Sequence, residues 1–445
     1  MVLGEIMQLD PLKILRELVE IKSVNNPSEG VKPSIEVPKY IQEKLSEIGV
    51  ESDVIEVDGY YSVYGKIGDG RPIILFMAHF DTVPVDVSQW SYPPFKLTID
   101  NGKGYGRGSV DDKGNVAAIM TMLSNLIEHR FNGSVLFAFT GDEEIGGRRG
   151  AAVIRDKLIE SGLKPDYMVN CDGHGMMVII RRRCGFNVQV KVPSRKIKVT
   201  GRLIKKRFEI RAPVYETRHA AYFMPGVDSH PFIAASEYLM YHPNTKVISV
   251  EGGFIKSNVI PSWIELKVVE EGEGEEFTVD EGLTQLIRTI IPIVRSPVKP
   301  EKYSDYGVSI TPNIYLEENG FHRLVIDVRA MTINLEDLAP IKESILENIP
   351  EAEVTMRGGT GYLYTDKNED IVRYSLSILQ ELGVKSKTME GAGASDSRYF
   401  APLGVKCIDF GPLGGNIHGP NEYIIVDSLY TTAKFYEKLA LKLLG

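Results

Sequence analysis

The stretch IILFMAHFDTVP, residues 73–84, indicates the fold more directly than any other part of the chain. Its first six residues are all apolar, which is typical of a strand buried on both faces of a parallel sheet. Polar His79 and Asp81 follow where that strand should end. Around it lie helical patterns at 12–21, 37–48, 114–129 and 151–162, and short apolar strands at 134–140 and 166–171. Strands that alternate with helices predict an α/β domain with a mostly parallel sheet flanked by helices.

The pattern changes between residues 185 and 331. Apolar residues alternate at 186–192 and again at 263–269, which is typical of a sheet with one open face. The α/β pattern returns later, with helices at 371–382 and 426–444 and a strand at 405–410. The sequence therefore predicts one α/β domain, 1–184 and 332–445, interrupted by an inserted α+β domain, 185–331.

The composition excludes several classes of protein. The net charge is −9 and the pI is about 5.6, which argues against nucleic acid as a partner. One basic stretch, 195–207, is interpreted as a solvated strand or loop face. The three cysteines argue against a disulfide framework and favour a reducing compartment. The start of the chain has no basic n-region, and no apolar run approaches the length of a membrane span, so we expect a cytoplasmic protein.

Polar residues gather at the predicted ends of buried strands and in tight loops. They are His79 and Asp81, Asp111 and Asp112, Asp142 to Glu144, Asp172, and His418. Ligands of open α/β sheets bind beyond the carboxyl ends of the strands, so we expect these side chains to meet. Imidazole and carboxylate groups suit zinc, and also manganese or cobalt. Two such ions can share one bridging carboxylate.

Each motif alone has an ordinary structural interpretation. A lone His-X-Asp more often lies on the surface, and Asp142 to Glu144 alone would be a solvated acidic turn. Asp111 and Asp112 could cap a helix, and Asp172 could form a turn before Gly173. The combination favours a site, because all the motifs fall at corresponding places in one α/β pattern.

These motifs together resemble the M20 family of zinc peptidases and amino-acid deacylases, over nearly the whole chain. The matching segments are MAHFDTVP, GRGSVDDKG, TGDEEIGG, GASDSRYF and NIHGPNE. The resemblance implies that His79 and Asp172 bind one zinc ion and that Glu144 and His418 bind the other. It also implies that Asp111 bridges both, next to a cis Asp111–Asp112 peptide bond.

The resemblance further implies roles in catalysis and substrate binding. Glu143 would be the general base, and Asp81 would orient His79 through its far ring nitrogen. The inserted domain would be a lid and dimerisation domain that makes the protein a homodimer. Its His219 would contact the substrate carbonyl, often across the dimer interface. Asn258, Arg329 and Arg398 would position the substrate, although salt bridges of Arg329 with Asp327 and of Arg398 with Asp396 are an equal alternative for the arginines.

The expected activity is hydrolysis of an amide bond by two zinc ions, for which cobalt or manganese could substitute. The substrate would be small and would carry a carboxylate, as a dipeptide, a peptide or an N-acyl amino acid does. The segments 193–215 and 271–318 look longer than a minimal lid needs, so the narrow substrate class stays open. Two alternatives are hydrolysis of a non-peptide C–N bond, as in an N-carbamoyl amino acid, and a non-catalytic binding protein on the same fold.

Overall fold

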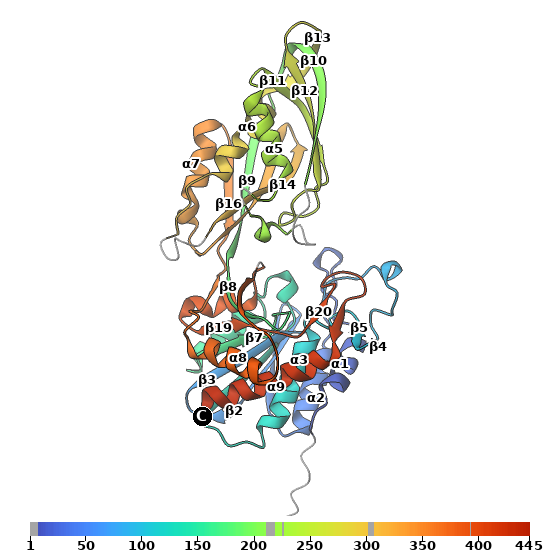
Figure 1. The fold of residues 1–445 in the computed structure, drawn as a ribbon, viewed down its shortest axis with the longest axis vertical. Helices are drawn as coiled ribbons and strands as arrows, with labels where there is room; N and C mark the ends of the chain where they lie inside the picture. Colours follow the sequence, from blue (N-terminus) through green and yellow to red (C-terminus); the bar gives the residue numbers. More distant parts are fainter. Residues whose placement is uncertain (1–7, 211–218, 225–226, 301–306, 392) are drawn as a thin grey trace, which may run out of the picture. The chain divides into compact units, whose positions relative to one another are not determined.

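A computed structural model describes residues 8–210, 219–224, 227–300, 307–391 and 393–445 of the chain (Figure 1). The chain forms two compact units. The first unit comprises Met1–Arg182, Tyr362–Gly391 and Ser395–Gly445, and the second comprises Arg183–Gly361 with Ala392–Ala394. Apart from Ala392–Ala394, the second unit is thus one continuous insertion between two parts of the first.

A nine-stranded mixed sheet forms the centre of the first unit. In spatial order its strands are β1 (Ser52–Val57), β2 (Tyr60–Asp69), β6 (Gly133–Thr140), β3 (Ile73–His79), β7 (Tyr167–Asn170), β19 (Lys406–Asp409), β8 (Val178–Arg182) and β17 (Leu363–Tyr364), with β18 (Thr388–Gly391) also paired to β8. The central strands β6, β3, β7 and β19 are parallel to their neighbours in this group. The pairs β1–β2, β2–β6, β19–β8 and β8–β17 are antiparallel, whereas β18 runs parallel to β8, so the predicted parallel arrangement holds at the centre and only in part toward the edges.

Helices cover both faces of this sheet. They are α1 (Pro11–Glu20), α2 (Glu36–Glu47), α3 (Lys113–Leu126), α4 (Ala151–Glu160), α8 (Asp370–Glu381) and α9 (Val426–Leu444). Alternate residues of β3 enter two different cores. Ile74 and Phe76 pack with residues of α1, α2, α3, α8 and α9, whereas Leu75 and Met77 pack with residues of α4. This confirms the expectation that the strand predicted at 73–78 is buried on both faces.

The register of the parallel strands brings their carboxyl ends together. His79 at the end of β3 lies opposite Thr140 at the end of β6, and Met77 lies opposite Asn170 at the end of β7. The loops that follow these three strands therefore begin side by side. A small sheet adds two more loops to the first unit, in the order β20 (Gly414–Gly415), β21 (Tyr423–Ile425), β5 (Lys103–Tyr105) and β4 (Thr98–Asp100). Since β21 pairs with β5, the loop before β21 and the loop after β5 lie close together.

The second unit contains two antiparallel four-stranded sheets. One has the order β11 (Thr245–Gly252), β12 (Trp263–Glu271), β10 (Lys196–Glu209) and β13 (Glu275–Asp280); the other has β14 (Ser309–Glu318), β15 (Phe321–Ala330), β9 (Cys184–Pro193) and β16 (Glu353–Gly358). Its helices are α5 (Pro231–Tyr241), α6 (Glu281–Val294) and α7 (Ala339–Asn348). The unit extends to Gly361, beyond the predicted end at 331, because β16 pairs with β9 and α7 packs on α6.

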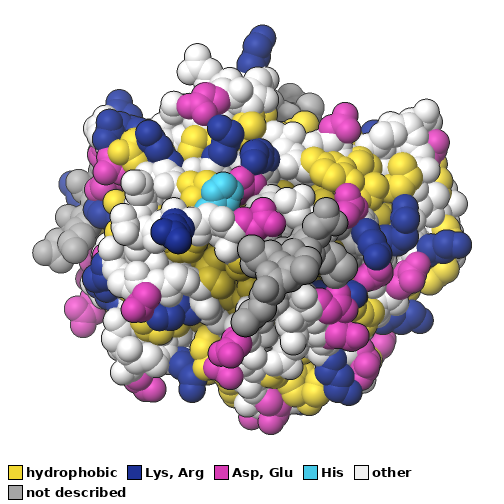
Figure 2. All heavy atoms as spheres, turned by 90° about the horizontal axis from the view of Figure 1, so that it is seen from below, with side chains coloured by type: hydrophobic (Ala, Val, Ile, Leu, Met, Phe, Trp, Pro, Cys, Tyr) yellow, Lys and Arg dark blue, Asp and Glu magenta, His cyan; other side chains and the backbone are white. Residues whose placement is uncertain are grey.

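The basic stretch at 195–207 lies largely on the exposed strand β10. Two of its charges are paired with acids on the neighbouring strands, as Lys198–Glu276 and Arg202–Glu270. On the face drawn in Figure 2, basic and acidic side chains are likewise interspersed. Among the residues that the structure describes, every helix is too short or too polar to cross a membrane.

Candidate metal centre

The predicted ligands of the first unit all lie at the carboxyl edge of its sheet. His79 ends β3, Asp172 follows β7, and Glu144 lies in the short helix η3 (Glu143–Ile145) after β6. Asp111 precedes α3, and His418 lies in the loop between β20 and β21. Segments far apart in sequence therefore supply five side chains to one place.

Two groups of possible ligand atoms are present. His79, Glu143 and Asp172 form one group and Asp111, Glu144 and His418 form the other; within each group the ligand atoms lie within 4.8 Å of one another. Among the described residues these are the groups of three or more such side chains that meet this criterion.

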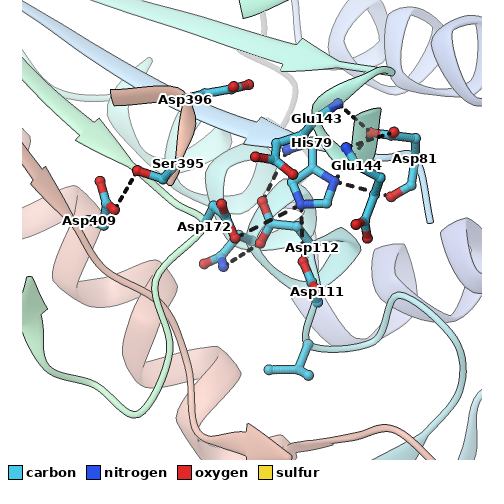
Figure 3. A network of polar contacts seen from close by, with 12 residues as sticks. His79, Asp81, Asp111, Asp112, Glu143, Glu144, Asp172, Ser395, Asp396 and Asp409 are labelled. Carbon is cyan, nitrogen blue, oxygen red and sulfur yellow. Dashed lines mark hydrogen bonds and ion pairs between the residues drawn. The ribbon is translucent and has the colours of Figure 1, made fainter. Parts of the chain in front are cut away.

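Asp111 connects the two histidines. Its Oδ1 lies 3.0 Å from Nε2 of His79, and its Oδ2 lies 3.0 Å from Nε2 of His418. Asp172 approaches the same nitrogen of His79 at 3.9 Å, and Figure 3 shows both carboxylates on one side of that ring. Glu144 lies 3.1 Å from Nε2 of His418. The Asp111–Asp112 peptide bond is cis, as the family resemblance implied.

Asp81 is fully buried and organises the surrounding loops (Figure 3). Its Oδ1 lies 3.3 Å from Nδ1 of His79, the ring nitrogen that faces away from Asp111. The same carboxylate accepts hydrogen bonds from the backbone N–H groups of Glu143, at 3.1 Å, and Glu144, at 3.2 Å. Asn25 donates a further bond of 2.8 Å. One carboxylate thus fixes both the histidine and the acidic pair.

Asp112 anchors the backbone of the same site. Its Oδ2 accepts the N–H of His79 at 3.0 Å, and its Oδ1 accepts a 2.6 Å bond from Asn115. The side chain is buried, and burial raises its pKa well above the usual range. Asp112 therefore faces the protein interior and holds the strand end that carries His79.

The titration behaviour of the site reflects crowded carboxylates. Burial, and then the charge of Asp111, raise the pKa of Glu144 to about 7. Burial also raises the pKa of Glu143, and burial with the charge of Glu143 raises that of Asp172. Burial opposes the ionisation of Asp111, but hydrogen bonds from His418 and His79 lower its pKa below the usual range.

The donor set fits divalent cations. Four carboxylates converge with two imidazoles, and such a concentration of negative charge calls for positive charge nearby. Oxygen and imidazole donors without thiolates suit zinc, manganese or cobalt. A carboxylate that offers one oxygen to each side suits two ions that share a ligand.

Arg398 also lies in the first unit, in the short helix η6 (Asp396–Tyr399). Its guanidinium lies 3.3 Å from Asp396, so the alternative role in a salt bridge is present in the structure. Its positive charge nevertheless acts on Glu143, where it opposes the effect of burial on the pKa. Nearby, Ser395 donates a 2.7 Å hydrogen bond to Asp409 and ties this motif to β19 (Figure 3).

Three predicted substrate contacts lie in the second unit. Arg329 makes a two-pronged salt bridge with Asp327, with both N–O distances at 2.8 Å. Asn258 lies 3.1 Å from Nε2 of His219. Burial, and then the charge of Arg329, lower the pKa of His219 to about 4, so this imidazole is neutral at pH 7.

The hydrogen bonds of His219 define its tautomer. Its Nδ1 accepts the N–H of Ala221 at 3.1 Å, so the ring proton of the neutral imidazole must be on Nε2. That proton needs an acceptor, whereas the amide nitrogen of Asn258 is placed against it and the amide oxygen is buried without a partner. If the amide oxygen and nitrogen of Asn258 are exchanged, the oxygen accepts the hydrogen bond from Nε2–H of His219.

Some site residues carried no assigned role in the sequence analysis. Arg107 and Glu422 lie inside the quoted motifs GRGSVDDKG and NIHGPNE, so their position was a usable signal. Asn25 comes from a segment without any recognisable motif, and the contact with Asp81 across 56 residues is visible only in the structure.

Imidazoles and carboxylates that converge at the carboxyl edge of an α/β sheet are the donor set of a divalent metal site. The chain matches the profile of peptidase family M20/M25/M40 over residues 75–442, and it belongs to this family. It is therefore an enzyme of the amidohydrolase and metallopeptidase type.

Curated relatives and solved structures are similar to this chain over nearly its whole length. Succinyl-diaminopimelate desuccinylase of Orientia tsutsugamushi is 24% identical over 443 residues, covering 96% of this chain and 94% of the relative. The enzyme of the same name from Herminiimonas arsenicoxydans is 25% identical over 428 residues, covering 93% and 94%. Among structures, aminoacylhistidine dipeptidase of Vibrio alginolyticus has a TM-score of 0.72 at 14% identity, covering 100% of this chain and 99% of that one. A metallo-carboxypeptidase of Sulfolobus solfataricus has a TM-score of 0.63 at 18% identity, covering 98% and 99%. The structural likeness concerns the fold.

Proposed function

We propose that the protein hydrolyses an amide bond in a small substrate that carries a carboxylate, with two divalent metal ions, zinc in the first instance. The observation that carries this proposal is the position of Asp111, which offers one oxygen toward His79 and the other toward His418. His79 and Asp172 would complete one metal site, and Glu144 and His418 the other. When bound, the metals would act as Lewis acids toward the scissile carbonyl and lower the pKa of the attacking water.

Glu143 is proposed as the general base. Its side chain lies among the ligand atoms of the His79 group, and burial raises its pKa, which makes it a better proton acceptor. It would take a proton from the attacking water and deliver it to the amide nitrogen. The water oxygen bonds to the carbonyl carbon, the C–N bond breaks, and an amine and a carboxylate are released. Asp81 would hold Glu143 in place by accepting a hydrogen bond from the backbone N–H of Glu143.

The substrate class rests on the relatives and on the arginines. The two curated relatives are named as desuccinylases, and two of the structural neighbours as a dipeptidase and a carboxypeptidase. Amino acids with an N-acyl or N-aminoacyl group share one amide next to one carboxylate. Arg329, Arg398 and Asn258 are the side chains proposed to bind that substrate.

His219 is proposed to contact the substrate carbonyl from the second unit of a partner copy. Its neutral ring carries one proton on Nε2, and this N–H could donate to an oxygen that gains negative charge once the substrate takes the place of Asn258 as acceptor. Mixing inactive His219→Ala with inactive Glu143→Ala should restore part of the activity if the protein is a homodimer with shared sites. Absence of recovery after demonstrated subunit exchange would contradict this arrangement.

The experiment that tests the proposed function is hydrolysis of a substrate panel by metal-stripped protein to which zinc, manganese or cobalt is returned. The panel contains dipeptides, acetyl and succinyl amino acids, and carbamoyl amino acids. Metal-dependent release of an amino acid from a dipeptide, an acetyl amino acid or a succinyl amino acid supports the proposal and identifies the substrate class. Cleavage of the carbamoyl compounds alone would replace it with the alternative of a non-peptide C–N hydrolase.

A further inference from the structure

The carboxylate of Glu422 accepts several hydrogen bonds from the backbone of the loop that carries Asp111. Its Oε1 accepts the N–H groups of Val110 and Asp111, each at 3.1 Å. Its Oε2 accepts the N–H of Gly108 at 3.0 Å and Nη1 of Arg107 at 2.5 Å. The side chain is fully buried. Four donors converge on this one buried carboxylate, and the guanidinium places a positive charge beside it.

Arg107 connects this loop to the one that carries His418. While Nη1 binds Glu422, Nη2 donates a 3.1 Å hydrogen bond to the carbonyl oxygen of Gly419, the residue after His418. Arg107 is only 2% exposed, and the ring of Trp90 covers its guanidinium at 5.3 Å. The planar guanidinium holds two acceptors at a fixed separation, which a single ammonium group cannot do.

The His418 loop needs such external support. His418 has a φ of 61°, and Asn416 and Asn421 also lie in the left-handed region, at 57° and 55°. Residues other than glycine persist in this region only when their surroundings hold them there. The His418 side chain is itself about half exposed, at 52%, so burial contributes little to holding it. The bond from Arg107 to Gly419 ties this loop, whose last residue is Glu422, to the loop that carries Asp111.

We propose that Glu422 and Arg107 are positioning residues that hold Asp111 and His418 at the separation required for two metal ions. Glu422 sets the backbone of Asp111, and Arg107 carries that position over to the His418 loop. This inference rests on the proposed assignment of Asp111 and His418 as metal ligands. Neither residue touches the ligand side chains or any group that reacts. Each would act through the backbone of the loops that carry the ligands.

The test measures zinc affinity and stoichiometry of metal-stripped full-length variants by competition titration. In Glu422→Gln the amide nitrogen must face N–H donors, so the Asp111 loop shifts. We expect zinc binding about 10- to 100-fold weaker, the range seen when groups that orient ligands are removed. Arg107→Lys keeps a charge for Glu422 and breaks the bond to Gly419, so we expect one of two zinc equivalents to weaken and the other to bind as before.

Glu437→Gln is the matched control. Glu437 is a buried glutamate of α9 that accepts bonds from Asn125 and Lys434 and contacts none of the proposed ligands. It should lower the thermal stability of the metal-free protein without changing zinc affinity. Wild-type zinc affinity in Glu422→Gln, or an equal loss in Glu437→Gln, would overturn the inference.

A fourth variant separates the inference from the proposed function. Asp111→Asn should abolish the binding of two zinc ions if the ligand assignment is right. If Asp111→Asn loses zinc and Glu422→Gln does not, the positioning role alone is wrong. If Asp111→Asn keeps both ions at wild-type affinity, the assignment of the metal centre itself fails, and the inference with it.

Discussion

Replacing Asp81 by asparagine should slow catalysis even in samples that are saturated with metal. The carboxylate is fully buried and accepts bonds from the backbone N–H groups of Glu143 and Glu144 and from the side chain of Asn25. Asparagine keeps one acceptor oxygen and places an NH₂ group against donors. Hydrogen bonds to a charged group contribute about 1.5–3 kcal/mol each, so a loss of about 2 kcal/mol is expected at the turn that carries Glu143.

If that loss falls on the transition state, kcat/KM decreases about 30-fold, since about 1.4 kcal/mol corresponds to a factor of ten. The assay is steady-state hydrolysis of the best substrate of the panel, with zinc content measured on the same samples. Asp280→Asn is the control, because Asp280 is also buried and accepts two backbone N–H bonds, from Leu283 and Arg195, in the second unit. Equal kcat/KM in Asp81→Asn and Asp280→Asn would refute the reasoning.

Two further predictions concern the base and the pH dependence of stability. Glu143→Gln should bind zinc as the wild type does but lose about 100- to 10,000-fold in kcat, the usual contribution of a general base; near-wild-type turnover would exclude Glu143 from that role. Burial lowers the pKa of His230 from 6.5 to about 4, so this ring is neutral in the folded protein and protonates more readily when unfolded. Its contribution, about 3 kcal/mol, is fully present above pH 6.5 and is lost as the pH falls toward 4. Chemical unfolding of His230→Gln across this range should therefore show a shallower loss of stability than the wild type, and an unchanged slope would contradict the prediction.

The parts of the fold that the sequence predicted best are those with a strong local signal. Strand β3 was expected at 73–78 and is found at Ile73–His79, because a continuous apolar run between polar ends has few other interpretations. Helix α9 was expected at 426–444 and is found at Val426–Leu444. The gathering of His79, Asp111, Glu144 and His418 also followed from the rule that loops meet at the carboxyl edge of a sheet.

The parts that were missed depend on partners distant in sequence. The sequence predicts that the α/β domain resumes at 332, but β16 completes a sheet of the second unit by pairing with β9. No pattern local to 353–358 shows which sheet this strand joins. Helix α6 was not predicted, although Leu283, Leu286, Ile287 and Ile290 recur at helical spacing; the local signal against a helix is Pro292, which lies inside it. Glu422 was visible in a motif, but its role depends on backbone donors more than 300 residues away.

The central claim is that this chain holds two metal ions and needs both. The most direct measurement returns zinc in steps to metal-stripped protein and follows amide hydrolysis and bound metal together. The account predicts that activity rises with bound zinc and becomes constant at two equivalents for each chain. Full activity at one equivalent, or hydrolysis by protein free of metal, would contradict it.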